Sequence, residues 1–278
     1  MIRRLAIAAC ILTSPLLNTP AESEVLIAPT RIVLERGERS AELVIVNKGD
    51  EEAAFRVSIE NRRMLENGSL ELAEDKQDGE LFAIDHVRYA PRRVILEPGG
   101  KQTIRVSANL ASGLEPGEYR SHLRLMSVPT SAGRSLPAAT DTEENALSIQ
   151  LIAIRSLTIP IILRVGELNA EVQITDLRID DKQRQSDNGE EHLLVARFAR
   201  EGSRSTYGDV QIFLDGQREP VYFARGVAVY TPNNERDVIL PLPNDVHDQL
   251  QGQPVRIAYV SSDPDNQQTY AELRTVLN

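Results

Sequence analysis

One stretch of the sequence, residues 145–167, constrains the fold more than any other. It reads NALSIQLIAIRSLTIPIILRVGE and consists mostly of Leu and Ile, interrupted by Arg155 and Pro160. A membrane-spanning helix needs about twenty apolar residues with few or no charges. Arg155 brings a charge and Pro160 would break a helix, so a membrane span is excluded.

The same stretch carries the signature of a β-strand. It is rich in β-branched residues and begins with strict alternation, in which apolar Leu147, Ile149 and Leu151 are separated by Ser148 and Gln150. Ordinary strands run to about five or six residues. A strand of this length is either a buried core strand or a strand kept for a partner.

The N-terminal residues predict that the chain is exported. Arg3 and Arg4 are followed by an apolar run and then by small residues up to Ala21, which is typical of a secretory signal peptide over residues 1–21. Its removal would take the net charge from −10 to −12 and remove Cys10, the single cysteine. We therefore expect a secreted, acidic chain that is stabilised by its core alone and binds no nucleic acid.

Short alternating segments with turns between them predict an all-β fold without helices. Before the polar stretch 127–144 the expected strands are 26–34, 40–47, 54–59, 87–96, 102–106 and 117–126. After residue 166 a fainter series covers 172–179, 192–200, 209–215, 221–230, 237–242, 255–260 and 270–277, with a polar loop at 181–191. Strands at such intervals indicate two β-sandwiches, one over residues 22–165 and one over 166–278.

The sequence offers no catalytic constellation. The four histidines, His86, His122, His192 and His247, are not at metal-ligand spacing, and no phosphate loop or nucleophile motif is present. The acidic pairs at 180–181 and 263–265 are typical of solvated turns. We expect a non-enzymatic protein without cofactor or metal.

Several ordered motifs resemble one family. PTRIVLERGERSAELVIVNKGDEEAAFRVSI, YAPRRVILEPGGKQTIRV and PGEYRSHLRLMSVP follow one another, and a polar loop and the long apolar strand complete the order. Over residues 25–166 this succession resembles the periplasmic pilus chaperones of the chaperone–usher pathway, and IPIILR is similar to their divergent, archaic-type branch. The second half resembles them mainly in size and strand character.

The resemblance implies two immunoglobulin-like domains in an L and a last strand of the first domain that is lent to a pilin subunit. Main-chain pairing and alternate apolar side chains would supply the affinity. The side chains that would enter the subunit are Leu147, Ile149, Leu151 and Ala153.

The resemblance also assigns roles to charged residues. Arg31 matches a cleft arginine that holds a subunit carboxylate, whereas Pro160 stands where the family has a lysine, and Arg155 is a candidate for the second charge. A further cluster, which would fix the angle between the domains, is expected from Glu118, Arg164 and Asp263.

The sequence thus predicts a periplasmic chaperone that binds pilin subunits and delivers them to an outer-membrane usher, without stable membrane insertion. Its exposed strand edges would also allow the free protein to self-associate. The alternative is a secreted two-domain adhesin or surface structural protein, but aromatic residues make up only 4% of the chain. A secreted hydrolase ranks third.

Overall fold

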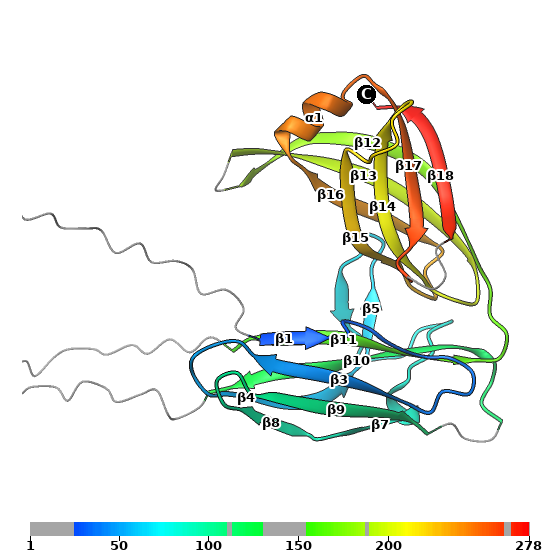
Figure 1. The fold of residues 1–278 in the computed structure, drawn as a ribbon. Coiled ribbons are helices and arrows are strands. Elements are labelled where there is room, and N and C mark those ends of the chain that lie inside the picture. The colour runs from blue at the N-terminus through cyan, green and yellow to red at the C-terminus, as the bar shows by residue number, and fades with distance from the viewer. Residues whose placement is uncertain (1–24, 110–112, 130–153, 187–188, 264–267, 278) are drawn as a thin grey trace, which may run out of the picture.

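The structure is a computed structural model that describes residues 25–109, 113–129, 154–186, 189–263 and 268–277. Two β-sandwiches follow one another along the chain and meet at an angle, so that the molecule has the shape of an L (Figure 1). The predicted all-β class with two immunoglobulin-like sandwiches is confirmed. No helix in the described part of the chain is long and apolar enough to cross a membrane.

The first sandwich consists of two facing sheets. One has the strand order β1-β3-β9-β7 and the other the order β2-β11-β10-β4-β8. The strands are β1 (Val25–Ala28), β2 (Ile32–Leu34), β3 (Ser40–Asn47), β4 (Ala53–Glu60), β7 (Val87–Ala90), β8 (Arg93–Leu96), β9 (Lys101–Ala108), β10 (Gly117–Val128) and β11 (Ser156–Val165).

Prolines divide two of the predicted strands between the sheets. The expected strand 26–34 is split around Pro29 into β1, which pairs with β3, and β2, which pairs in parallel with β11. The expected strand 87–96 is split in the same way at Pro91 into β7 and β8. Proline cannot donate to a ladder, so the chain leaves one sheet there and enters the other.

Alternation along the strands builds the core between the two sheets. In β3, Leu43, Ile45 and Asn47 are buried on one face, as the sequence predicts. The largest fully buried side chains of this core are Ile32, Leu43, Ile45, Ile104, Leu123, Leu125, Ile161 and Leu163.

The second sandwich packs the sheet β12-β13-β16 against the sheet β15-β14-β17-β18. Its core includes Phe198, Val210, Ile212 and Tyr259. The strands are β12 (Ala170–Ser186), β13 (Gly189–Gly202), β14 (Thr206–Leu214), β15 (Tyr222–Val229), β16 (Glu235–Leu242), β17 (Pro254–Ser261) and β18 (Thr269–Val276).

Two local predictions for the second sandwich are wrong. In the predicted loop 181–191, the described residues 181–186 and 189–191 belong to β12 and β13, which pair from Arg184 and Glu191 to Ser186 and Gly189. The chain also contains helix α1 (Asn244–Leu250), and a 3₁₀ turn lies at Ile84–His86 in the first sandwich. Helices this short are marginal in isolation. α1 instead buries His247 and Leu250 against the sandwich, which the sequence pattern does not reveal.

The sandwiches are joined in two places. The chain runs from β11 to β12 through Gly166, whose φ of +83° few other residues adopt. A hairpin of β5 (Arg62–Met64) and β6 (Leu70–Leu72) rises from the first sandwich to the second (Figure 1). At the junction Met64 and Ile162 pack with Ala228 and Tyr230, which form a small core between the domains.

Candidate functional site

The described end of the long apolar strand, β11, has two different edges. One edge pairs with β10 along its whole length, from Ser156 to Val165. The other edge pairs with β2 only at residues 161–163. Residues 156–160 therefore have an edge without a strand partner among the described residues, and Ile154 and Leu157 nearby are 60% and 42% exposed.

The four side chains expected to enter a subunit, Leu147, Ile149, Leu151 and Ala153, lie outside the described residues. Arg155 is described, and it is exposed. Its main-chain N–H donates to the Ser127 hydroxyl at 2.8 Å, and its carbonyl accepts from the N–H of Ser127 at 2.8 Å. These bonds fix the point at which β11 begins beside β10.

Arg31 lies at the junction of the two sandwiches, just before β2. Its guanidinium carbon is 3.9 Å from the centre of the Tyr207 ring of β14. The ring covers one face of the guanidinium, and Arg31 makes no hydrogen bond or ion pair within the described part of the chain. Its N–H groups are therefore available to an acceptor from outside.

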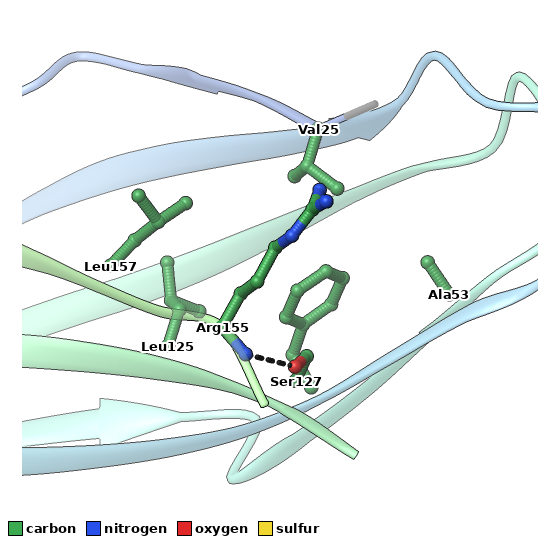
Figure 2. A pocket seen from close by; sticks show the side chains of 7 residues that line it. Val25, Ala53, Leu125, Ser127, Arg155 and Leu157 are labelled. Carbon is green, nitrogen blue, oxygen red and sulfur yellow. Dashed lines mark hydrogen bonds between the residues drawn. The ribbon is translucent and has the colours of Figure 1, made fainter. Parts of the chain in front are cut away.

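Arg31 and Arg155 do not form one site. Ile32 pairs with Ile161, so Arg31 lies beside the middle of β11, whereas Arg155 precedes the strand. Six residues at about 3.3 Å each separate Arg155 from Ile161, which is roughly 20 Å. The side chain of Arg155 extends toward Val25, at the end of the sandwich where β11 begins (Figure 2).

Glu118 and Arg164 do form a pair at the junction. They are cross-strand partners on β10 and β11, and Arg164 Nε donates to Glu118 at 3.0 Å. The Glu118 side chain is fully buried and that of Arg164 is 11% exposed. Burial acts to lower the pKa of Arg164, but the carboxylates of Glu118 and Glu35 outweigh it and raise that pKa overall.

The Glu118 carboxylate reaches across to the second domain. It accepts hydrogen bonds from the Ser205 hydroxyl, from the Ser205 N–H at 3.1 Å and from the Thr231 hydroxyl at 3.4 Å. Among the described residues, the hydrogen-bond and ion-pair partners of the Glu118–Arg164 pair are Glu35, Ser205 and Thr231. The N–H of Asp263, the expected third member, donates to the Ser261 hydroxyl at 3.1 Å, and Asp263 is not among the partners of the pair named above.

The same face of β10 supplies a second link that sequence reasoning missed. Arg120 is 5% exposed, stacks 4.3 Å from the centre of the Tyr230 ring and donates to the carbonyls of Arg62 and Thr231. Burial lowers its pKa. The signal was present in the sequence, because Glu118, Arg120, His122 and Arg124 recur at every second position of β10, which places them on one face.

Two of the four histidines lie together in the second sandwich. His192 and His247, far apart in the sequence, stack with ring centres 3.6 Å apart and nearly parallel. The nitrogen lone pairs lie in the ring planes, so those of parallel rings do not converge on one ion. No group of three or more metal-ligating side chains is present in the described residues.

Comparison with known proteins gives matches only among solved structures. No family model matches the chain, and no curated protein matches its sequence. A chain of the CsuC–CsuE chaperone–tip adhesion subunit complex, from the archaic chaperone–usher Csu pili of Acinetobacter baumannii, is 10% identical, with a TM-score of 0.48. That match covers 92% of this chain and 100% of the other.

Two further matches are chaperones from other bacteria. The CupB2 chaperone of Pseudomonas aeruginosa is 12% identical over 91% of this chain and 100% of its own, with a TM-score of 0.46. The DraB chaperone of E. coli is 13% identical over 91% and 96%, with a TM-score of 0.44. These proteins belong to the family that the sequence resembles. At such identities and TM-scores, the function of this chain has to be argued from its own residues.

Proposed function

We propose that this protein is a non-enzymatic periplasmic chaperone of the chaperone–usher pathway. It captures pilin subunits by donating the strand that runs into β11, keeps them from aggregating and delivers them to an outer-membrane usher. Residues 1–21 direct its export.

The observation that carries the proposal is the half-paired state of β11. Residues 161–163 are held between β2 and β10, which anchors the strand in the sandwich. The preceding residues pair on one side only, and the exposed Ile154 and Leu157 lie along them. A strand that is anchored at one end and open along the other can pair with a partner without unfolding its own domain.

Arg31 gives the complex a second attachment point. Its guanidinium is held on the Tyr207 ring and has free N–H donors in the angle between the domains. A carboxylate of the subunit would form charge-assisted hydrogen bonds there, and such bonds are about twice as strong as neutral ones. Pro160 stands at the position where the family has its second cation.

The open edges also support self-association of the free protein. The edge of β11 at residues 156–160 and the outer edge of β1 have no strand partner in the described structure. Unpaired edges pair with one another when no client is present. Free chaperone should therefore associate at high concentration and dissociate when a subunit binds.

Periplasmic co-expression tests the proposal. The full chain, tagged at its C-terminus, is produced with the small secreted proteins encoded beside its gene, and complexes are purified through the tag. We expect one small β-rich protein at a one-to-one ratio. Ile149→Asp should abolish this capture and leave the chaperone folded, because the acid would enter an apolar groove unpaired.

Ile95→Asp is the matched control. Ile95 is an apolar residue of β8, at the opposite edge of the same sheet, and is 53% exposed. The Ile95→Asp variant should capture the subunit as well as the wild type does. Normal capture by Ile149→Asp would contradict strand donation, and a tagged chain that always emerges alone would favour the adhesin.

A further inference from the structure

The first sandwich contains an apolar cavity at the end where β11 begins. It has a volume of about 190 Å³ and lies between the two sheets (Figure 2). Its lining comes from β1, β4, β10 and the start of β11, and the residues are Val25, Ala53, Phe55, Leu125, Ser127, Arg155 and Leu157.

The cavity reaches from the core to the surface. Phe55 and Leu125 are 6% and 1% exposed and belong to the core, whereas Leu157 is 42% exposed at the rim. Native interiors are close-packed and leave few voids. An apolar opening that leads to the core is therefore a candidate for contact with another molecule.

The strand edges on either side leave the cavity accessible. β1 is the last strand of its sheet, and the β11 edge at residues 156–160 has no partner among the described strands. Side chains of neighbouring strands share the face of their cross-strand partners. A strand that pairs with this edge of β11 therefore places every second side chain beside Leu157 and Ile159, which face the space between the sheets.

One charged group limits what can enter. The side chain of Arg155 extends across the cavity toward Val25 (Figure 2). No acidic side chain pairs with it within the described residues. The Ser127 hydroxyl accepts the Arg155 N–H and keeps its own O–H as a donor, which also favours an acceptor at the rim. The cavity thus suits an apolar side chain that is followed by a carboxylate at the rim.

We infer that this cavity is a receptor site for one apolar side chain of the captured subunit, about the size of Leu or Phe, with an acidic residue two positions away that pairs with Arg155. The inference rests on the proposed function. It adds a contact in the reverse direction, in which the chaperone receives a side chain from its client while lending its own strand.

Synthetic peptides provide the probe. A ten-residue host of alternating Thr and Val carries one guest position, Leu, Phe or Ala, and Glu or Lys two residues further on. Fluorescence anisotropy with the full chain measures the affinity. We expect the Leu and Phe peptides to bind at least tenfold more tightly than the Ala peptide, and the Glu series to bind more tightly than the Lys series.

Filling the cavity should remove the preference for a large guest residue. Ala53→Leu and Val25→Phe add bulk to the lining from opposite sheets, so one of them serves if the other fails to fold. Either should bind the Leu and Ala peptides equally, whereas Arg155→Glu should reverse the preference between Glu and Lys. Ile95→Phe, at the other edge, is the control and should behave like the wild type.

Three outcomes would overturn the inference. They are equal affinity for all guest residues, no detectable binding to the wild type, and a guest preference that survives filling. The last two are expected if residues of this chain or a second copy occupy the cavity. If Ala53→Leu still captures the subunit and Ile149→Asp does not, the cavity is not a receptor site for the subunit, and the chaperone proposal stays intact. Capture retained by both would reject strand donation as well as the cavity, and a tagged chain that captures no subunit at all would reject the proposed function itself.

Discussion

His122 shows how closely single residues are enclosed at the junction. Its ring is fully buried on β10, and neither nitrogen has a hydrogen-bond partner among the described residues. Burial, and then the cations of Arg120 and Arg62, lower its pKa to about 3. Glu60, its cross-strand neighbour on β4, is already paired with Arg62 and Arg124.

This burial predicts loss of stability in acid. In the unfolded chain the imidazole binds a proton near pH 6.5, whereas in the folded chain it stays neutral down to about pH 3. Between these values the unfolded state holds more protons, so stability falls as the pH falls, by at most about 1.4 kcal/mol per pH unit. His122→Leu removes this contribution.

Urea unfolding at a series of pH values measures the effect. The difference in unfolding free energy between the wild type and His122→Leu should be constant above pH 7 and shift in favour of the variant below about pH 6. Comparing the two proteins cancels the titration of their shared carboxylates. A difference that stays constant down to pH 4 would show that the ring is protonated inside the fold.

Arg31 should matter for binding more than for stability. Its stacking on Tyr207 is worth about 0.5–1 kcal/mol at a partly exposed site. A charge-assisted bond to a subunit carboxylate is worth about 1.5–3 kcal/mol, which is roughly tenfold or more in affinity. Arg31→Ala should therefore weaken capture at least tenfold and leave the melting temperature nearly unchanged.

Arg31→Lys separates charge from shape. It keeps the charge and loses the planar stack, so capture should be intermediate. Capture and thermal unfolding are measured on the same preparations. A large fall in melting temperature with unchanged capture would instead make Arg31 a residue that joins the two domains.

Among the strands, those of the β5–β6 hairpin are absent from the sequence prediction. Each has three residues, which is too short to show a period. It is held by the second domain, because the Asp237 N–H donates to the Glu66 carbonyl at 2.7 Å and the Asn233 amide donates to the Met64 carbonyl at 2.9 Å. Contacts so distant in sequence leave no local pattern.

Gly68, in the turn of the hairpin, tests this contact. Its φ is +82°, and a Cβ there would lie 2.4 Å from the guanidinium of Arg236. The Arg236 guanidinium donates to the Ala228 carbonyl, so it cannot move freely. Gly68→Ala should cost about 1–2 kcal/mol for the left-handed conformation and about 1 kcal/mol more for the displaced contact.

Gly99→Ala is the matched control for urea unfolding. Gly99 has a φ of +72° in a turn where a Cβ would meet nothing within 4 Å. The two variants share the conformational cost, so the difference between them reports the contact with the second domain. Equal losses of unfolding free energy in the two variants would mean that the turn of the hairpin is not held against the second domain.

The elements also show where sequence reasoning succeeds and where it stops. Alternation located β3, whose bounds match the expected strand 40–47, whereas the expected strand 26–34 is divided between the two sheets. The polar residues 181–191 show no alternation, although residues 184–186 pair with residues 189–191 as strands. Helix α1 depends on tertiary packing of His247 and Leu250, so no local hydrophobic periodicity predicts it.

At the scale of the whole molecule, several sets of contacts join the domains, among them the stacking of Arg31 on Tyr207 and of Arg120 on Tyr230. A first further set is the hairpin on the second sandwich, and a second is the buried carboxylate of Glu118 with Arg164 and Ser205. Of the second set, the resemblance indicated the pair on β10 and β11 but not Ser205. A serine before a strand has no distinctive pattern until the fold brings it to the carboxylate.

The pair should be energetically coupled. Breaking a buried ion pair by removing one partner costs about 3–5 kcal/mol, whereas an exposed pair contributes about 0–1 kcal/mol. Glu118 is fully buried, so Arg164→Ala leaves a carboxylate with only the Ser205 and Thr231 donors. Adding Glu118→Ala should therefore cost less than the sum, with a coupling energy of about 1–3 kcal/mol.

A double-mutant cycle on urea unfolding measures the coupling, and small-angle X-ray scattering of the same variants measures the angle between the domains. Glu35 is the internal control: it also pairs with Arg164 but its side chain is 53% exposed, so Glu35→Ala should cost about 0–1 kcal/mol and leave the scattering unchanged. Arg164→Ala should broaden the distribution of angles, since the hydrogen bond from Arg164 to Ser205 in the second sandwich and the ion pair that orients Glu118 are then lost. Zero coupling between Glu118 and Arg164, with unchanged scattering, would show that the hairpin and the small core around Met64 and Tyr230 set the angle without them.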